Sequence, residues 1–226
     1  MQNKDLSVII PALNEERTLR VCLDSVRKLD PLEIIVVDGE SADRTSKIAE
    51  EAGAIVIQSP KGRGIQMNRG ASIAKGEILL FLHADTRIPD MKKSLASAAL
   101  NTYAGGFFHL EFDDGSVSTR LVEFFANLRA RLLSLPYGDQ AIFIKRDIFK
   151  KVGGFREYPF LEDLDFAIRI KNYGKLKYIP LKVVASARRL NKGFPFSPIF
   201  VSFRNVFIAL LFLFGLSPFS LIKLYK

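Results

Sequence analysis

The chain has 226 residues, enough for one large domain or two small ones, and 48% of them are hydrophobic, so a sizeable core can form. The formal charge of +9 suits a phosphorylated small molecule or an anionic membrane surface. Nucleic acid is not expected as a partner, because neither a basic helix nor an aromatic–basic RNA motif is present. The single cysteine, Cys22, excludes an internal disulfide and a cysteine metal cluster, and we expect it to be a buried structural thiol.

The beginning of the chain is not typical of a signal peptide. Met1 to Leu6 is polar, and the apolar run Val8–Ile10 is too short for the hydrophobic region of such a peptide. We therefore expect a cytoplasmic catalytic face, with peripheral contact at the inner face of the plasma membrane left open.

Strands and helices alternate along the first part of the chain. Apolar runs predict strands at Leu6–Ile10, Glu33–Val37, Ala54–Gln58 and Ile78–Leu82. Pro11 is expected to end the first strand, and Asn14 to cap a helix that carries Leu19, Cys22, Leu23 and Val26 and is broken by Asp30–Pro31. Ser41 or Asp43 is expected to cap a second helix that ends at Gly53, and Gly64–Ala74 reads as a third helix.

Continuous apolar strands are expected where helices cover both faces of a parallel sheet. Such doubly wound sheets bind ligands at the carboxyl ends of their strands. Asp38 and Asp85 both lie just past predicted strand ends, so we expect both to face one crevice.

The second part of the chain is less regular. It predicts helices at Pro89–Leu100, Val117–Leu135 and Glu162–Tyr173, and strands at Phe107–Phe112, Ala141–Lys145, Leu176–Ile179 and Val183–Ala187.

An uncharged run, Asn205–Ile222, lies near the end of the chain and is close to the minimum length for a bilayer span. Gly215 and Ser217–Pro218 interrupt it, so a membrane-surface helix with basic edges fits better than a true span. A helix that docks on the domain or on a second copy, through residues 198–222, is the other option.

Four motifs together resemble the family 2 glycosyltransferases with the GT-A fold. They are Pro11-x-x-Asn14-Glu15, Asp38-Gly39-x-Ser41-x-Asp43-x-Thr45, His83-Ala84-Asp85 and Glu162-Asp163-x-Asp165. The resemblance covers roughly residues 5 to 190. The segments VVDGESADRT, GRGIQMNRGA, LLFLHADT, GDQAIF and GGF...LEDLDF also resemble a narrower subgroup, the arsenosugar-biosynthesis-type or radical-SAM/selenodomain-associated transferases, whose acceptor is poorly defined.

The resemblance implies an α/β fold with a Rossmann-like mixed sheet flanked by helices, followed by a hydrophobic C-terminal helix. The GT-A domain would span residues 1–190, with a nucleotide-binding half at about 1–90 and an acceptor half at about 91–190. Residues 191–226 would form a helical extension.

The resemblance also implies donor-binding residues: Pro11, Asn14, Glu15, Asp38, Arg63, Asn68, His83 and Ala84. Asp38 would read the uracil, with a plain turn carboxylate as the alternative. Glu15 would contact the nucleoside, unless it is only a first-turn helix acid. Arg63, in a glycine-rich loop at a helix start, would clamp phosphate oxygens or else belong to a solvated basic turn. Asn68 would lie beside the nucleotide or only support this loop.

In GT-A enzymes the last Asp of an Asp-x-Asp-like motif coordinates a divalent cation, which maps onto Asp85. One or two protein carboxylates suffice when phosphates complete the shell. His83 replaces the first Asp, so it would either ligate Mn²⁺ or hydrogen-bond the sugar nucleotide. The alternative for Asp85 is a cap on the turn toward Ile88.

In inverting family 2 enzymes the second acid of an "ED" pair takes the proton of the acceptor, which maps onto Asp163. Capping of the helix start by this acid is the alternative. The acceptor or diphosphate would meet Asp139, Gln140, Glu162, Arg188 and Arg189. For Asp139 and the two arginines, a turn carboxylate and plain surface charge are the alternatives.

We therefore predict an inverting, metal-dependent glycosyltransferase that uses Mg²⁺ or Mn²⁺ and a nucleoside-diphosphate sugar, with a UDP-sugar as the first expectation, and an unknown hydroxyl acceptor. A nucleotidyltransferase is one rival. A non-catalytic sugar-nucleotide or membrane-binding module is the other.

Overall fold

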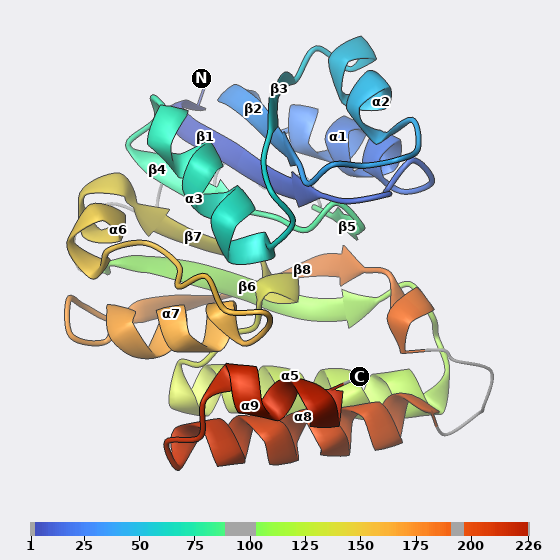
Figure 1. The fold of residues 1–226 in the computed structure, drawn as a ribbon, viewed down its shortest axis with the longest axis vertical. Helices are drawn as coiled ribbons and strands as arrows, with labels where there is room; N and C mark the ends of the chain where they lie inside the picture. The colour runs from blue at the N-terminus through green and yellow to red at the C-terminus, as the bar shows by residue number, and fades with distance from the viewer. Residues whose placement is uncertain (1–2, 89–102, 191–196, 226) are drawn as a thin grey trace.

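The computed structural model describes residues 3–88, 103–190 and 197–225 (Figure 1). Its strands form one sheet in the order β3-β2-β1-β4-β7-β6-β8-β5. The strands are β1 (Asn3–Ala12), β2 (Pro31–Asp38), β3 (Ile55–Gln58), β4 (Ile78–Phe81), β5 (Thr86–Arg87), β6 (Gly105–Phe112), β7 (Ile142–Lys145) and β8 (Leu176–Ala185). The α-helices are α1 (Leu19–Arg27), α2 (Thr45–Glu51), α3 (Arg63–Ile73), α5 (Val117–Leu133), α6 (Arg146–Val152), α7 (Glu162–Ile170), α8 (Ser197–Leu213) and α9 (Pro218–Tyr225).

The sheet is parallel in its first half and mixed beyond it. Strands β2 and β4 both pair with β1 in parallel, and β3 pairs with β2 in parallel. Strand β7 then runs antiparallel to both β4 and β6. The chain therefore leaves β1 toward β2 on one side and returns to β4 on the other, which creates the switch point where open sheets bind ligands.

Helices cover both faces of this sheet. Helices α1 and α2 pack with the β1 side chains Val8 and Ile10 into one core. Helices α3, α6 and α7 pack with Ile9 and Ile142 into the other. Successive strand side chains point to opposite faces, so the uninterrupted apolar run in β1 serves both cores. Cys22 is buried in the first core, as predicted.

Strand β1 does not end at Pro11. It continues to Ala12, and Pro11 pairs in register with Val37 of β2. The carbonyl of Ile9 accepts a hydrogen bond from Leu82, and that of Ala12 accepts one from Gly39. Successive residues of β1 bond in turn to β4 on one side and to β2 on the other. Pro11, two residues after Ile9, therefore faces the β4 side, where β4 has already ended, so the N–H that proline lacks is not needed for the sheet.

Both predicted helix caps are wrong. Helix α1 begins after Thr18, while Asn14 has φ of 54° and its side chain accepts the N–H of Ala42, 28 residues further along the chain. Helix α2 begins after Arg44, and the carboxylate of Asp43 accepts the N–H of Thr45. These side chains form loop-to-loop and turn contacts in place of the expected caps.

Strand β8 replaces the two short strands predicted near residues 176–187. Its register against β6 shifts between Phe108 and His109, whose partners are Ile179 and Lys182. Pro180 and Leu181 are the two residues passed over, and a proline is tolerated at such an irregularity. The helix predicted at Pro89–Leu100 lies outside the described residues.

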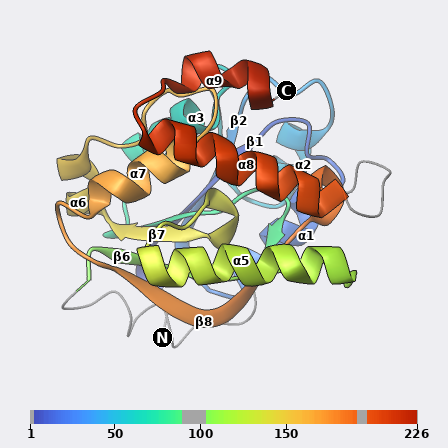
Figure 2. The same cartoon turned by 90° about the horizontal axis from the view of Figure 1, so that it is seen from below.

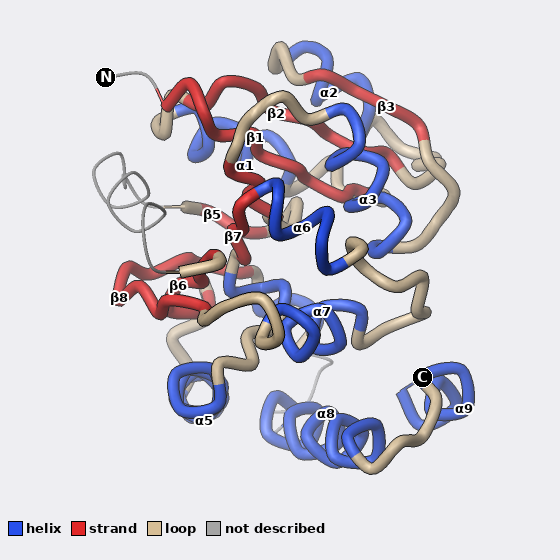
Figure 3. Tube along the Cα trace, turned by 90° about the vertical axis from the view of Figure 1, so that its left-hand side faces the viewer, coloured by secondary structure: helices blue, strands red, loops and turns tan. Residues whose placement is uncertain are grey.

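The C-terminal run forms two helices, which corrects the single hydrophobic helix of the sequence analysis. Gly215 has φ of 96° between α8 and α9, and Pro218 opens α9. In the described part of the chain, helices fall short of the length and apolarity that a membrane crossing requires. Ala209 of α8 packs with Leu164 and Ala167 of α7, so α8 docks on the sheet-bearing part of the molecule (Figures 1 and 3).

Gly105 of β6 lies directly against the backbone of β7. A Cβ at this position would lie 2.8 Å from the Cα of Ile144 and would overlap the carbonyl oxygen of Phe143. We expect Gly105→Ala to lower the free energy of unfolding by about 2 kcal/mol or more, because backbone atoms must move. Urea unfolding measures this, with Gly115→Ala as the control, since only the end of the Arg120 side chain comes within 4.0 Å there. Equal stability of the two variants would contradict the β6–β7 packing.

Candidate active site

Side chains from distant segments line one cavity of about 180 Å³. Its walls are formed by Arg63, His83, Asp85, Phe112, Tyr137, Asp139, Phe160, Leu161, Asp163, Ala185, Ser186, Leu190, Asn205, Ile208 and Tyr225. The lining combines charged and polar side chains with aromatic and aliphatic ones. The volume lies below the roughly 300–1,000 Å³ of sites that enclose a drug-sized ligand, so the enclosed part suits a single small ring.

Gly138 lies where His83 and Asp163 meet. This residue opens a short 3₁₀ turn, η1 (Gly138–Gln140). A Cβ on Gly138 would lie 2.5 Å from Nε2 of His83 and 3.4 Å from Oδ2 of Asp163. The missing side chain therefore allows the end of β4, the η1 turn and the start of α7 to close around one point.

Asp163 is held by two backbone donors. Its Oδ2 accepts the N–H of Gly138 at 2.6 Å, and its Oδ1 accepts the N–H of Leu164 at 2.7 Å. It lies in the first turn of α7, where the helix dipole favours a carboxylate. Asp163 therefore both bonds a backbone N–H at the start of α7, as the capping alternative stated from the sequence has it, and lies on the cavity wall.

Asp139 brings an unpaired oxygen into the cavity. Its Oδ1 is buried and has no hydrogen-bond partner among the described residues. Burial raises the pKa of Asp139 to about 6, against the opposing effect of Arg129. The nearby carboxylates of Asp163 and Asp85 also raise it. A carboxyl group with this pKa changes its charge close to neutral pH.

Arg63 and Glu162 form an ion pair at the edge of the cavity. Arg63 is the first residue of α3, and its Nε lies 2.7 Å from Oε1 of Glu162, whose side chain is buried. Burial raises the pKa of Glu162 against the opposing effect of Arg63, and the charge of Asp163 raises it further. The other oxygen of Glu162, Oε2, is buried without a partner in the described structure.

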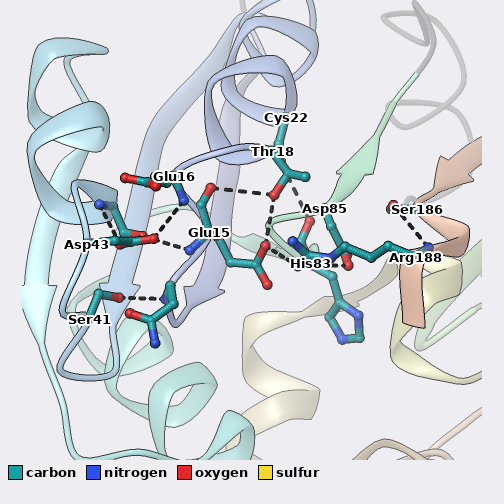
Figure 4. A network of polar contacts seen from close by, with 12 residues as sticks. Glu15, Glu16, Thr18, Cys22, Ser41, Asp43, His83, Asp85, Ser186 and Arg188 are labelled. Atoms are coloured by element: carbon teal, nitrogen blue, oxygen red, sulfur yellow. Dashed lines mark hydrogen bonds and ion pairs between the residues drawn. The ribbon is translucent and has the colours of Figure 1, made fainter. Parts of the chain in front are cut away.

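A second arginine, Arg188, connects Glu15 of the Pro11-x-x-Asn14-Glu15 motif to Asp85, which follows β4 (Figure 4). Arg188 donates to the buried carboxylate of Glu15, and its Nη2 lies 3.6 Å from Oδ2 of Asp85. Thr18 also donates to Glu15 at 2.8 Å. Glu15 precedes α1 and is not a first-turn helix acid, which removes the alternative stated for it.

Asp38 ends β2 at the same edge of the sheet but does not line the cavity. Its carboxylate accepts hydrogen bonds from Ser46 Oγ at 2.6 Å, from Gln58 Nε2 at 3.2 Å and from the N–H of Ser41 at 3.2 Å. The expectation that Asp38 and Asp85 share one crevice is met only in part: both lie at or just after the carboxyl ends of parallel strands, β2 and β4, which lie on either side of β1.

Several other predicted residues have structural contacts. Asn68 exchanges two hydrogen bonds with the backbone of Phe155, which supports the loop rather than the cavity. Gln140 is fully buried and donates to the carbonyl of Phe108. Pro11 and Ala84 are buried. Asn14 joins the loop after β1 to the loop after β2 through its hydrogen bond with Ala42. The side chain of Arg189 is not among the parts that the structure describes.

Sequence reasoning missed the contribution of the C-terminal helices. Asn205 and Ile208 of α8 and Tyr225 of α9 line the cavity, and Tyr225 stacks on Phe160 with ring centroids 4.6 Å apart. The available signal was Asn205, a polar side chain beginning an uncharged run. Tyr137 was also missed, and its ring lies 3.5 Å below the guanidinium of Arg129.

Asp85 fits a cation that is shared with a diphosphate. The described residues contain no group of three or more His, Cys, Asp and Glu side chains that could hold a metal by themselves. One carboxylate that faces a cavity is nevertheless the usual protein share when substrate phosphates and water complete the shell of Mg²⁺. The His83 ring points away from the Glu15–Asp85–Arg188 contacts (Figure 4), so it is less suited as a second ligand.

The family model for "Glycosyl transferase family 2" matches residues 7–153. The chain belongs to glycosyl transferase family 2. It is 32% identical over 177 residues to the PGL/p-HBAD biosynthesis glycosyltransferase of Mycobacterium bovis, covering 72% of this chain and 68% of that protein. It is also 27% identical over 209 residues to the probable glycosyltransferase YdaM of Bacillus subtilis, covering 79% of this chain and 49% of that protein. The chain is thus a glycosyltransferase.

Solved structures confirm the GT-A type of fold. The mannosyltransferase PcManGT from Pyrobaculum calidifontis, in complex with GDP-Man and Mn²⁺, matches with a TM-score of 0.69 at 19% identity, over 98% of this chain and 68% of that one. S. aureus TarS 1–349 matches with a TM-score of 0.63 at 20% identity, over 92% of this chain and 64% of that one. Glucosyl-3-phosphoglycerate synthase from Mycobacterium tuberculosis, with Mn²⁺, UDP and phosphoglyceric acid, matches with a TM-score of 0.62 at 20% identity, over 93% of this chain and 78% of that one.

Removing Arg63 leaves Glu162 buried without its counter-charge. We expect Arg63→Met to lower the free energy of unfolding by about 2 kcal/mol at pH 8, below the roughly 3–5 kcal/mol of a fully buried pair because Arg63 is 33% exposed. Glu162 already has a raised pKa, and without Arg63 it rises further. The loss of stability should therefore shrink as pH falls and Glu162 becomes protonated.

Urea unfolding between pH 5 and pH 8 tests this expectation. Arg63→Met/Glu162→Gln should recover most of the loss and remove its pH dependence. Lys151→Met, which breaks the exposed pair with Asp147, is the control and should cost less than about 1 kcal/mol. A loss for Arg63→Met that does not change with pH would contradict the role given to Glu162.

Proposed function

We propose that the protein transfers a sugar, with inversion, from a nucleoside-diphosphate sugar to an acceptor hydroxyl. The observation that carries this proposal is that Asp85, Asp139 and Asp163 line the same cavity. UDP is the first expectation for the nucleotide, and the UDP complexes of TarS and of the M. tuberculosis synthase support it. The GDP-Man complex of PcManGT makes GDP the second.

Asp163 acts as the base in this proposal. The acceptor oxygen attacks the anomeric carbon from the face opposite the diphosphate, and the C1–O bond breaks with its electron pair passing to the phosphate oxygen. The acceptor proton passes to the Asp163 carboxylate, which two backbone N–H groups hold in a fixed position. Fixed donors of this kind keep the carboxylate oriented at no cost during the reaction.

Arg63 and Arg188 stabilise the charge that develops on the leaving diphosphate. Both are paired with carboxylates in the structure, Arg63 with Glu162 and Arg188 with Glu15 and Asp85. When bound at Asp85, Mg²⁺ or Mn²⁺ supplies further positive charge against the phosphates. The Mn²⁺ and Mg²⁺ in the M. tuberculosis complexes support this metal dependence.

The nucleoside is assigned to the carboxyl ends of β1 and β2, where Asn14, Glu15 and Asp38 lie. The Asp38 carboxylate now accepts from Ser41 and Ser46. A base N–H would have to share or replace one of these donors. Arg188 and Arg189 complete the diphosphate side in this assignment, and Asp139 meets sugar or acceptor hydroxyls.

We still divide the chain into a GT-A unit at residues 1–190, with halves at about 1–90 and 91–190, and an extension at residues 191–226. Because α8 and α9 of this extension form part of the cavity wall, we assign the extension to the site as well. The narrower arsenosugar-type or radical-SAM-associated subgroup stays a prediction and specifies no acceptor. Contact of residues 198–222 with the inner face of the plasma membrane or with a second copy stays a prediction as well.

A nucleotidyltransferase is disfavoured because the end of β1 and the turn that follows it read Pro11-Ala12-Leu13-Asn14 and are not glycine-rich. Product analysis distinguishes the two: release of UDP supports glycosyl transfer, and release of pyrophosphate supports the rival. A non-catalytic binding module would release neither product.

A thermal-shift panel tests the donor and the metal. We expect one of the UDP-, GDP- and dTDP-sugars to raise Tm in the presence of Mn²⁺, because a ligand at 100 times its Kd adds about 2.7 kcal/mol of stability. Asp85→Ala should abolish the metal-dependent part of the shift and keep the fold. A Mn²⁺-dependent shift that is unchanged in Asp85→Ala would exclude Asp85 as the metal ligand.

Asp163→Asn tests the base. The exchange keeps the size of the side chain but removes its ability to take a proton, so we expect transfer to fall by about 10²–10⁴-fold while the donor-induced thermal shift is kept. Asp147→Asn, at an exposed ion pair on α6, is the matched control and should retain full activity. Wild-type turnover by Asp163→Asn would move the base to another residue.

A further inference from the structure

Helix α5 has its polarity reversed with respect to the protein interior. Its buried side chains are Ser118, Thr119, Asn127 and Ala130. Its exposed large apolar side chains are Val117, Leu121, Phe124, Phe125, Leu128, Leu132 and Leu133. A helix that meets only water on its outer side normally turns its apolar stripe to the core.

Polar contacts, together with the smaller apolar side chains Val122, Ala126 and Ala130, hold α5 to the sheet in this orientation. Asn127 accepts the N–H of Leu110 at 2.8 Å and donates to the carbonyl of the same residue at 2.9 Å. Glu123 accepts the N–H of Phe112 at 2.6 Å. Because these bonds satisfy the backbone of β6, the orientation of α5 is specified, and the outward apolar stripe is a fixed feature of the surface.

Helix α8 adds a second apolar stripe beside the first. It buries Ile208 and Ala209 and exposes Phe200, Phe203, Val206, Phe207, Leu210 and Leu213. Phe203 is 71% exposed, although aromatic residues are usually buried. Helices α5 and α8 lie side by side on the same outer side of the molecule in Figures 1 and 2. We call the exposed apolar residues of these two helices the α5–α8 face.

The charges on the helices of this side of the molecule are almost all positive. Within α5, α8 and α9 the basic residues are Arg120, Arg129, Arg131, Arg204 and Lys223, and the acidic one is Glu123. Arg120 and Arg131 are exposed and follow Val117 and Leu128 by three residues, so each lies along the edge of the apolar stripe. The Glu123 carboxylate accepts a hydrogen bond from β6 and interacts with Arg120, so it offsets one of these charges and leaves the three helices net positive.

We propose that the α5–α8 face binds an anionic lipid surface. Apolar side chains with basic residues at their edge are the combination that places a helix in the head-group region of a bilayer. Two copies of this face would bring like charges together, whereas anionic head groups oppose them. The two helices lie flat on the surface of the protein, and such contact needs no crossing of the bilayer.

The sheet side of α8 faces the cavity. Asn205 and Ile208 line it, together with Tyr225 of α9, while the opposite side of α8 carries Phe203 and Phe207. Contact with a bilayer therefore holds the cavity within one helix diameter of the head groups, roughly 10–12 Å. The lipid contact itself does not depend on the transfer reaction and is measured without it.

Sedimentation of the full chain with vesicles tests the proposal. We expect binding to vesicles of equal parts phosphatidylcholine and phosphatidylglycerol, much weaker binding to phosphatidylcholine alone, and a decline between 0.1 M and 1 M salt as the charges are screened. Phe124→Glu/Phe207→Glu should weaken binding to the mixed vesicles by about tenfold or more. Arg120→Gln/Arg131→Gln should reduce the preference for the anionic vesicles.

Val21→Glu is the matched control, because Val21 is an exposed apolar residue on α1, away from this face. It should bind vesicles as the wild type does. All variants are checked by their melting temperature and by the donor-induced shift, so a folding defect or a failed donor assignment is recognised separately. Absence of vesicle binding by the wild type, or equal binding by Phe124→Glu/Phe207→Glu, would overturn the proposal. So would light scattering that shows a dimer which those two substitutions dissociate.

Discussion

The hydrogen bond from the Gly138 N–H to Asp163 is the contact on which the site depends. It joins the η1 turn to the start of α7, two segments that the sheet alone does not hold together. His83 packs against the same glycine, so the end of β4 is included as well. Any side chain at position 138 would separate these three segments. The cavity exists because one backbone N–H and one missing Cβ bring them to a common point.

Two buried acids around this point, Glu162 and Glu15, are each paired with an arginine from a distant part of the chain. Arg63 pairs with Glu162, and Arg188 pairs with Glu15 and approaches Asp85. Such pairs are costly to desolvate and costly to break one partner at a time. Under the proposed function, the diphosphate would take the place of the carboxylates of Glu162 and Glu15 as the partner of Arg63 and Arg188. Donor binding would therefore exchange one negative partner of each arginine for another.

The sequence predicted those parts of the fold that depend on local order. The apolar runs that became β1, β2 and β4 and the position of Asp85 at a strand end follow from side-chain periodicity, and the motifs indicated the family. The partner of Glu15 could not be predicted in the same way, because Arg188 lies 173 residues further along the chain. Pro11 and Asn14 were misread for a related reason. Local preference predicts a strand end and a cap, whereas the neighbouring strand and loop decide what these residues do. The donors that surround Asp38 and the reversed polarity of α5 likewise depend on tertiary contacts.

Helix α8 is a shared wall between the interior of the site and the surroundings of the protein. Asn205 and Ile208 line the cavity on the inner side of α8, and Phe203 and Phe207 are exposed on its outer side. A fragment that stops near residue 190, which the boundary drawn from sequence would suggest, keeps every strand of the sheet yet loses this wall. In such a shortened protein, Asp85, Asp139 and Asp163 would be exposed to bulk water. If it failed to turn over a substrate, the cause would be the missing wall of the cavity and not a loss of the fold.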